Sequence, residues 1–154
     1  RLGILVDLAH LNEAGFWDVA ATSTRPLVAT HSAAHAVTPA TRNLTDRQLD
    51  AMAERGGLVG LNFGVGFLRD DGTRNPATPV GQMIRHLDHL IARLGEEGVA
   101  LGSDFDGTTT PDWLQTAAQL PALVAGMEAA GYGSALIDRL CWGNWMGLLR
   151  RVIG

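Results

Sequence analysis

Short runs of branched apolar residues alternate in this chain with longer segments whose apolar residues recur every three or four positions. The first two runs cover residues 4–10 (ILVDLAH) and 27–31 (LVATH). Runs of this length are typical of buried strands in a parallel sheet, and the spacing between them is typical of amphipathic helices. Both runs end at a histidine, so we expect His10 and His31 at the carboxyl ends of two strands.

Local helix signals separate the predicted strands. Asn12 is a good N-cap for a helix between the first two runs. Thr45, with Gln48 three residues later, forms a capping-box pattern, and Gly56 with Gly57 ends the helix that follows. These signals predict one crossover helix after each of the first two strands.

Two further strands are predicted at 58–63 and 99–102. Between them, residues 64–79 have the composition of a long loop, and the clearest helix of the chain begins at Pro79 and ends at Gly95. From about residue 112 onward, the pattern predicts helices that pack over the strands. We expect these helices to be broken at Pro121, at Gly131 to Gly133 and at Gly143.

The fourfold alternation of strand and helix predicts an α/β fold with a parallel sheet. A doubly wound sheet would carry a glycine-rich phosphate turn after a strand, and the chain has no GxGxxG or P-loop sequence. A (β/α)8 barrel takes roughly 250 residues and places catalytic groups at the carboxyl ends of several strands. Half of a (β/α)8 TIM-type barrel therefore fits the length and the polar positions best.

The composition is that of an ordinary globular domain. The 154 residues are 46% apolar and 18% charged, and the net charge of -4 argues against a nucleic-acid surface. No apolar run approaches 18 residues, so we expect no membrane segment. The single cysteine, Cys141, excludes an internal disulfide framework and favours a cytoplasmic protein, although an export signal could precede residue 1.

Three side chains are candidates for a common site. His10, His31 and Asp104 each follow a predicted strand. Two imidazoles and a carboxylate suit zinc far better than calcium or magnesium. A Ser-His-Asp arrangement would use Ser32 or Ser103 instead, but neither serine lies in a G-x-S-x-G elbow, which disfavours acyl-enzyme chemistry.

The other histidines suggest structural roles. His86 and His89 lie one turn apart in the long predicted helix. Because His86 borders the apolar stripe and His89 points away from it, we expect a core role and a surface role. His35 has no partner that the sequence identifies.

Six short motifs, in order along the whole chain, resemble one known family. The chain is similar to the carboxyl-terminal half of the membrane dipeptidase (renal dipeptidase) family, peptidase family M19, among the amidohydrolase-like metal-dependent barrels. No single motif is specific, but the set and its spacing are. The matching pieces are DLAH at 7–10, THS at 30–32, Arg42-Asn43 followed by Asp46, HLDHLI at 86–91, GSDFDG at 102–107 and Gly143-Asn144.

The resemblance implies a binuclear zinc site at the mouth of a barrel. His10 and His31 match the two histidines that hold one zinc, and Asp104 matches the residue beside the other zinc that handles protons. Arg42 matches the arginine that grips the terminal carboxylate of the substrate, a role that suits a guanidinium fork. The implied reaction is hydrolysis of a dipeptide, in which Asp104 passes a proton to the leaving amine.

Two positions in these motifs have no implied part in that reaction. Asp106 matches a motif position without a role that we can assign. Asp7 is expected to point away from neighbouring strand residues and to anchor structure.

The chain also departs from the family pattern. The His-x-Asp zinc pair of the family's first strand is absent, and each of the five glutamates falls in a predicted helix or a helix-to-strand turn, so none can bridge two metals. We expect residues 1–154 to form a partial dipeptidase barrel domain that binds metal weakly by itself. The alternative is a noncatalytic half-barrel with a binding or structural role, and a homo-oligomer stays open because a half-barrel sheet has unpaired edges.

Overall fold

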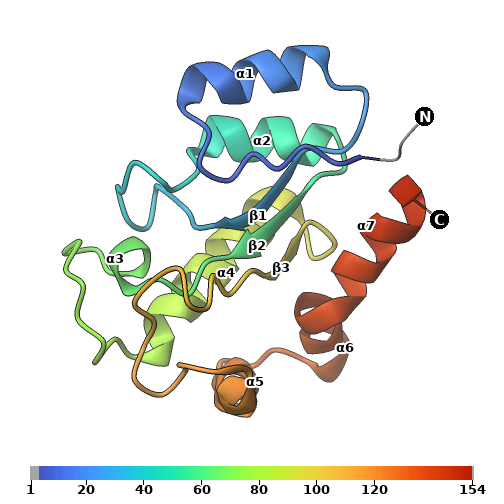
Figure 1. The fold of residues 1–154 in the computed structure, drawn as a ribbon. Coiled ribbons are helices and arrows are strands. Elements are labelled where there is room, and N and C mark those ends of the chain that lie inside the picture. The colour runs from blue at the N-terminus through green and yellow to red at the C-terminus, as the bar shows by residue number, and fades with distance from the viewer. Residues whose placement is uncertain (1–3, 154) are drawn as a thin grey trace.

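The computed structural model describes residues 4–153. Its centre is a parallel sheet of three strands in the order β1–β2–β3 (Figure 1), formed by Val28–Ser32, Leu58–Leu61 and Val99–Leu101. β2 and β3 lie within predicted apolar runs, β1 extends one residue beyond the predicted run 27–31, and helices connect successive strands. The α/β class expected from the alternating pattern is confirmed.

Helices precede, connect and follow the strands. Asn12 accepts a hydrogen bond from Gly15 at the start of α1, and the predicted capping box of Thr45 and Gln48 is present at the start of α2. The helices are α1 (Glu13–Thr22), α2 (Asp46–Glu54), α3 (Val65–Leu68), α4 (Val80–Leu94), the 3-10 turn η1 (Ala117–Gln119), α5 (Leu120–Ala129), α6 (Ser134–Asp138), the π-helical turn η2 (Arg139–Gly143) and α7 (Asn144–Ile153).

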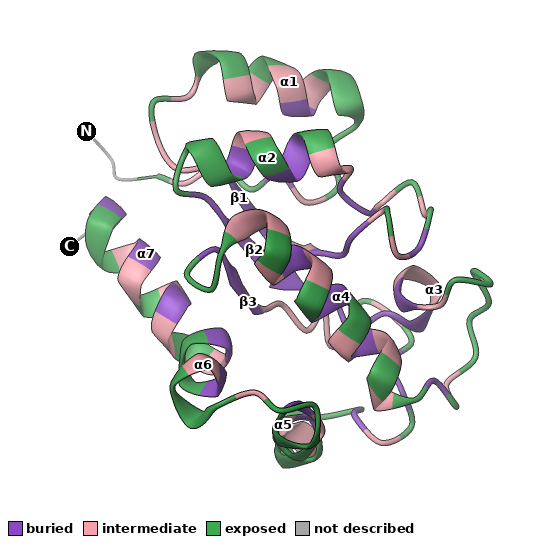
Figure 2. Cartoon of the chain, turned by 180° about the vertical axis from the view of Figure 1, so that it is seen from behind, coloured by how far each residue is buried: buried purple, intermediate pink, exposed green. Residues whose placement is uncertain are grey.

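The sheet is buried on both faces. One face contributes to a large core with α1, α2, α4 and α5, and the purple positions on α2 and α4 in Figure 2 mark their buried sides. The other face packs against α7, as the carboxyl-terminal pattern predicted. The buried residues of this smaller cluster are Val28, Leu58, Ala100, Leu148 and Val152. Burial of both faces explains why consecutive positions are buried at the start of each strand, rather than every second position.

The predicted first strand, residues 4–10, is wrong as a regular strand. Only Asp7 forms a parallel bridge, with Val28, and Leu8 donates one backbone hydrogen bond of 2.7 Å to the Val28 carbonyl. The next backbone N–H, of Ala9, turns to the Asp7 side chain instead of a ladder, and His10 adopts a left-handed φ of 71°. The segment still follows β1 and delivers His10 to the carboxyl end of the sheet.

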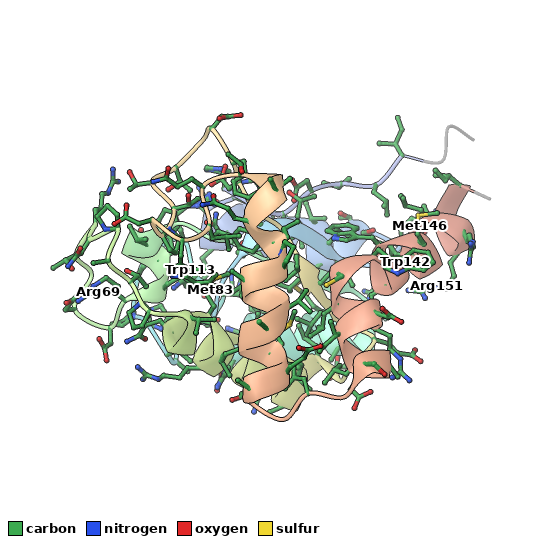
Figure 3. The ribbon with its side chains drawn as sticks, turned by 90° about the horizontal axis from the view of Figure 1, so that it is seen from below. Arg69, Met83, Trp113, Trp142, Met146 and Arg151 are labelled. Carbon is green, nitrogen blue, oxygen red and sulfur yellow. The ribbon has the colours of Figure 1, made fainter. Side chains whose placement is uncertain are left out.

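Two other local predictions differ from the structure. The loop at 64–79 contains the short helix α3, which forms because its first and last residues, Val65 and Leu68, are buried in the core. Gly143 does not break the last helix, since the π-helical turn η2 continues directly into α7. Figure 3 shows Trp142, Met146 and Arg151 along this continuous segment.

Among residues 4–153, none of the helices combines the length and apolarity that a membrane span would need.

Candidate active site

The two histidines that were expected to converge do so. Nε2 of His10 lies 3.0 Å from Nε2 of His31, and the two rings meet edge to face with their centroids 5.0 Å apart. His10 comes from the loop after the Asp7 bridge, and His31 comes from the end of β1. The two residues are therefore brought together by neighbouring backbone segments at one edge of the sheet, although 21 positions separate them in the chain.

A β-bulge in β1 sets the orientation of the His31 side chain. The ladder between β1 and β2 pairs Ala29 with Val59 and Ser32 with Leu61, so Thr30 and His31 together oppose the single residue Gly60. A bulge adds a residue to one strand and reorients the side chains at that point. The sheet thus has a local irregularity at the residue that carries the candidate metal ligand.

Two glycines make room for this bulge. A Cβ atom on Gly60 would lie 2.1 Å from the Thr30 carbonyl oxygen, and one on Gly102 would lie 2.0 Å from the same oxygen. Both separations are far below van der Waals contact, and the atom in the way belongs to the backbone. The conformation of β1 at Thr30 therefore requires glycine at both positions.

A hydrogen-bonded chain leads from Asp7 to the His31 ring. The Asp7 carboxylate accepts the Thr30 hydroxyl at 2.5 Å and the Thr30 backbone N–H at 2.9 Å, and the Thr30 hydroxyl oxygen lies 2.8 Å from His31 Nδ1. Desolvation opposes ionisation of Asp7, but the hydrogen bonds from Thr30 and from the Ala9 N–H lower its pKa below the ordinary value. Asp7 thus accepts hydrogen bonds as a carboxylate.

Asp104 lies at the same rim, directly after β3. It has a left-handed φ of 57°, and Asn62 donates a hydrogen bond of 3.0 Å to its Oδ2 atom. A Cβ atom on Gly107 would lie 2.3 Å from Asp104 Oδ1, so glycine at that position leaves room for the Asp104 carboxylate in its observed orientation. The carboxylate of Asp104 is thereby held by an amide from the end of β2 and by a tight turn.

Arg42 is half-buried beside the histidines. Its Nη2 atom donates to the His31 carbonyl oxygen at 3.2 Å, and its guanidinium lies over the Phe67 ring, 5.5 Å from the centroid. Its Nε and Nη1 atoms are buried and have no hydrogen-bond partner among the described residues. Buried unpaired donors are costly, so they mark a place where an anionic group would be stabilised.

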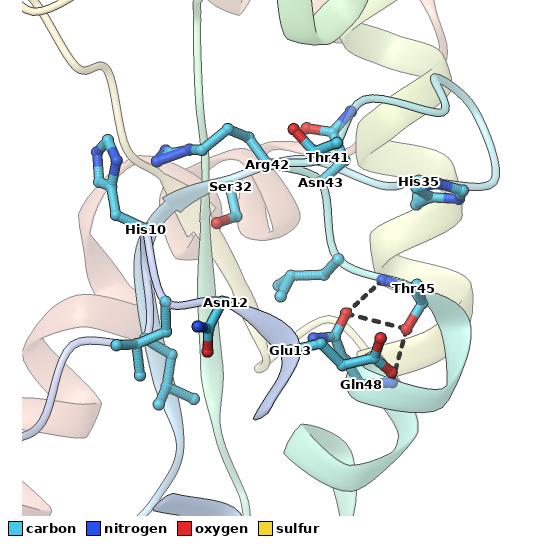
Figure 4. Close-up of a pocket in the computed structure, with 13 residues that line it drawn as sticks. His10, Asn12, Glu13, Ser32, His35, Thr41, Arg42, Asn43, Thr45 and Gln48 are labelled. Carbon is cyan, nitrogen blue, oxygen red and sulfur yellow. Dashed lines mark hydrogen bonds between the residues drawn. The ribbon is translucent and has the colours of Figure 1, made fainter. Parts of the chain in front are cut away.

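Two pockets adjoin at this rim, and His31 is not among the residues that line either of them. His10 and Arg42 contribute to both. One pocket, of about 360 Å³, also contains Asp104 and Asp106. The other, of about 260 Å³, extends toward His35, and Figure 4 shows Arg42 reaching toward His10 at its end. The histidine, the guanidinium and the carboxylate thus face one continuous space.

Backbone strain is concentrated at this rim. Within residues 4–153, the residues other than glycine that have a positive φ are His10, Asp104 and Asp106, with values of 71°, 57° and 65°. Each such conformation costs on the order of 1 kcal/mol and persists only where the surroundings enforce it. Positive φ angles that occur, within the described residues, only around the candidate site are typical of a functional site.

The donor set partly fits a metal ion. Two imidazole nitrogens that share one tetrahedral zinc lie about 3.3 Å apart, close to the observed 3.0 Å. Desolvation, together with the charges of Arg42 and His31, lowers the pKa of His10, which favours the unprotonated ring that a ligand needs. Among the described residues, however, no group of three or more His, Cys, Asp or Glu side chains is close enough to hold a metal ion. Asp104 shares the pocket without completing a three-ligand set.

The remaining histidines and serines lie outside this cluster of donors. His86 is fully buried in α4, and Nε2 of the partly exposed His89 lies 2.7 Å from Oδ1 of Asp46. Both match the predicted core and surface roles. Within residues 4–153, no hydrogen bond joins Ser32 or Ser103 to a histidine, so the geometry of an activated serine is absent there.

Sequence reasoning missed two residues at this rim. Thr30 was not considered as a partner of His31, and Asn62 was not considered as a partner of Asp104. Asn62 directly follows β2. A polar residue at the end of an apolar run was the same signal that identified the histidines, and it could have identified Asn62.

Three comparisons with known proteins agree on the family. Residues 1–153 match the model of the family described as membrane dipeptidase (peptidase family M19). A Klebsiella pneumoniae protein, described as an uncharacterised protein in the pqqA 5' region, is 52% identical over 151 residues, which are 98% of this chain and 56% of that protein.

Solved structures give the same result. The dipeptidase AC, a metallopeptidase of family M19, is 58% identical with a TM-score of 0.97 over 99% of this chain and 45% of its own. A metallopeptidase from Rhodobacter sphaeroides, liganded with a phosphinate mimic of the dipeptide L-Ala-D-Ala, has the same identity and TM-score over 99% of this chain and 43% of its own. The chain thus spans about half the length of the relatives it matches.

Proposed function

We propose that this chain, which belongs to the membrane dipeptidase family (peptidase family M19), carries the carboxyl-terminal part of a zinc-dependent dipeptidase active site. The observation that carries the proposal is the convergence of two histidine Nε2 atoms, 3.0 Å apart, beside the half-buried Arg42, whose Nε and Nη1 atoms are buried and unpaired among the described residues. Those two features supply a metal-binding pair and, in hydrogen-bond contact with the His31 backbone, a carboxylate-binding group, both of which a dipeptidase needs.

His10 and His31 would hold a zinc ion through their Nε2 atoms. A bound zinc ion would supply a positive charge that polarises a peptide carbonyl and promotes the ionisation of water. Because two ligands fall short of the three or four usual for zinc, further ligands would come from the part of the dipeptidase barrel that this chain does not contain. A complete enzyme would hold two zinc ions.

Arg42 would select substrates by their terminal carboxylate. Its unpaired Nε and Nη1 atoms are oriented donors in a half-buried position, where a charge-assisted hydrogen bond is strong. The hydrogen bond from Nη2 to the His31 carbonyl and the contact with Phe67 hold the guanidinium in place. Because Arg42 is held next to His31, a substrate whose terminal carboxylate binds there would have its scissile bond only a short way along the chain, which favours dipeptides.

Asp104 would transfer a proton during hydrolysis. The hydrogen bond from Asn62 and the tight turn at Gly107 fix its carboxylate against the pocket that His10 and Arg42 also line. A positioned carboxylate of this kind can take a proton from water and deliver it to the leaving amine. This role requires an orientation that is set before the substrate binds, and the strained φ of Asp104 is consistent with that requirement.

The same family membership supports a proposal for the whole domain. The three parallel strands, with polar groups at their carboxyl ends, would form part of a (β/α)8 barrel, and residues 1–154 would be its carboxyl-terminal half. The high TM-scores over less than half of each solved dipeptidase support this reading.

A chimera tests the function. In it, this chain replaces the matching part of the Rhodobacter sphaeroides metallopeptidase, to which it is 58% identical. We expect the purified chimera to contain zinc and to hydrolyse L-Ala-D-Ala, and Arg42→Met to raise KM strongly because the carboxylate contact is lost. A folded, zinc-loaded chimera without activity, or an Arg42→Met variant with unchanged kinetics, would contradict the proposal.

A noncatalytic role is the second candidate. It is favoured by the lack, within the described part of the chain, of a group of three metal ligands. The same chimera decides between the two candidates, because a chain that serves only as a binding or structural half-barrel would give a folded protein with neither zinc nor peptidase activity.

A further inference from the structure

The environment of His31 determines which of its ring nitrogens carries the proton. Asp7 Oδ2 accepts the Thr30 hydroxyl at 2.5 Å, and Thr30 Oγ1 lies 2.8 Å from His31 Nδ1. A hydroxyl has one hydrogen, and an ionised carboxylate can only accept. Since the Thr30 hydrogen points to Asp7, the Thr30 oxygen can only accept from His31. Nδ1 of His31 therefore carries a hydrogen.

The opposite end of the ring faces the candidate metal site. With hydrogen on Nδ1, the neutral His31 ring has its lone pair on Nε2, the atom that lies 3.0 Å from Nε2 of His10. Metals bind imidazole through that lone pair, and the hydrogen-bond partner of the other nitrogen usually sets the tautomer. The direction of one hydroxyl thus determines whether His31 can act as a ligand.

We propose that Asp7 and Thr30 are positioning residues that hold His31 in the Nδ1–H tautomer, with its Nε2 lone pair aimed at the metal site. Asp7 was expected only to anchor structure, and Thr30 was not considered. The hydrogen-bonded chain runs from a carboxylate through a hydroxyl to an imidazole. It joins the segment before His10 to the β-bulge that carries His31, so it also fixes the two histidines relative to each other.

Asp7→Asn is the sharpest variant. Oδ1 of Asp7 accepts two backbone N–H groups, from Ala9 at 3.0 Å and Thr30 at 2.9 Å, so an amide oxygen must take that place. The amide NH2 group then faces Thr30 Oγ1 and donates to it. The Thr30 hydroxyl turns to donate to His31 Nδ1, which moves the ring hydrogen to Nε2. The substitution changes almost no volume but reverses the direction of the chain of hydrogen bonds.

The tautomer can be measured on the 154-residue chain without metal. Two-bond ¹H–¹⁵N spectra assign the protonated nitrogen of His31 directly. We expect Nδ1–H in the unsubstituted chain and in Thr30→Ser, which keeps the hydroxyl, and Nε2–H in Asp7→Asn. Thr30→Val, which has the same shape without the hydroxyl, should give a mixture of both tautomers. Amide dispersion in the same spectra verifies that each variant is folded.

Zinc alone is then titrated into each variant while the His31 signals are followed. Loss of such an outer hydrogen-bond partner typically weakens metal binding by roughly 10- to 100-fold. We expect a loss of this size in Asp7→Asn and Thr30→Val, and affinity close to that of the unsubstituted chain in Thr30→Ser. Asp18→Asn and Thr24→Val are matched controls, since both residues are exposed and line neither of the two pockets.

The outcomes separate this inference from the proposed function on which it rests. An Nε2–H tautomer in the unsubstituted chain, or an unchanged tautomer in Asp7→Asn, overturns the positioning role whatever the zinc result. The expected tautomers, with equal zinc affinity in all folded variants, overturn it as well. An unsubstituted chain whose His10 and His31 signals ignore zinc at every concentration overturns the proposed metal site, while the tautomers still establish the hydrogen-bonded chain.

Discussion

His86 and His31 show two opposite uses of histidine in one small chain. His86 is fully buried, its Nδ1 accepts the Ala34 N–H at 3.1 Å, and its Nε2 lies 3.2 Å from both the Leu68 carbonyl and the Thr38 hydroxyl. Both ring nitrogens of His86 are therefore occupied by the core. At His31, Nδ1 faces the Thr30 hydroxyl, whereas Nε2 lies 3.0 Å from Nε2 of His10, a second imidazole at the rim of the sheet.

The partners of the two ring nitrogens distinguish a structural histidine from a candidate ligand better than burial or charge does. The His86 ring links α4 by hydrogen bonds to the loop after β1 through Nδ1 and to the end of α3 through Nε2. The Nε2 atom of His31 meets only another imidazole, and two such nitrogens side by side can share a metal ion. Substitutions at each position should therefore affect either stability or metal binding, but not both.

The largest effect is expected at the bulge that supports His31. In Gly102→Ala, the new methyl group would meet the Thr30 carbonyl at 2.0 Å and the Gly60 Cα at 3.0 Å, and backbone cannot move aside cheaply. We expect a loss of about 3 kcal/mol or more in urea unfolding and a weaker zinc affinity. Gly81→Ala is the control, since nothing lies within 4 Å there, and it should stabilise α4 by about 0.5 kcal/mol. Equal stability of the two variants would refute the steric role of Gly102.

His86→Ala should cost about 3 kcal/mol of stability, because it creates a cavity and leaves the Ala34 N–H unpaired in the core. Zinc affinity should not change, since the hydrogen-bond partners of His86, which are Ala34, Thr38 and Leu68, line neither of the two pockets. Urea unfolding and zinc titration on the same preparation measure both quantities. A variant that is stable but has lost zinc binding would reverse the roles assigned to the two histidines.

His10→Asn should have the opposite profile. Asparagine tolerates the left-handed φ of 71° but is too short to take the place of Nε2, so stability should change by no more than about 0.5 kcal/mol. We expect zinc affinity to fall by about 100-fold, which is about 2.7 kcal/mol. Calorimetric or NMR titration checks the affinity. A variant with unaltered zinc binding would exclude His10 as a ligand.

A smaller effect is expected from acid. Desolvation lowers the pKa of His86 from 6.5 to about 4, so the unfolded chain binds a proton between these values that the folded chain does not. Stability from this group is present above pH 6.5 and is lost as the pH falls toward 4, by about 2 kcal/mol at pH 5. His86→Gln keeps an acceptor without a titrating ring, and its urea unfolding free energy should fall less between pH 7 and pH 5. An equal fall in both proteins would locate the proton uptake elsewhere.

Local sequence determined the strands, the helix caps and the identity of the candidate ligands. Apolar runs predicted β1, β2 and β3 because a parallel sheet that is covered on both faces needs apolar residues throughout. The capping box of Thr45 and Gln48 acts within one helical turn, so it could be read from spacing alone. The family resemblance supplied the expected roles of His10, Arg42 and Asp104, which local patterns do not specify.

Tertiary structure decided what those residues contact. Residues 4–10 have the sequence of a strand, but backbone pairing depends on neighbours that are distant in the chain, and only one bridge to β1 forms. The Asp7–Thr30–His31 chain joins segments 23 residues apart. The direction of a hydrogen bond depends on which acceptor is nearest in space, and no spacing along the sequence encodes that. The sequence thus identified the two histidines as candidate ligands. The packing of the bulge against Gly60 and Gly102 determined the direction of the His31 ring.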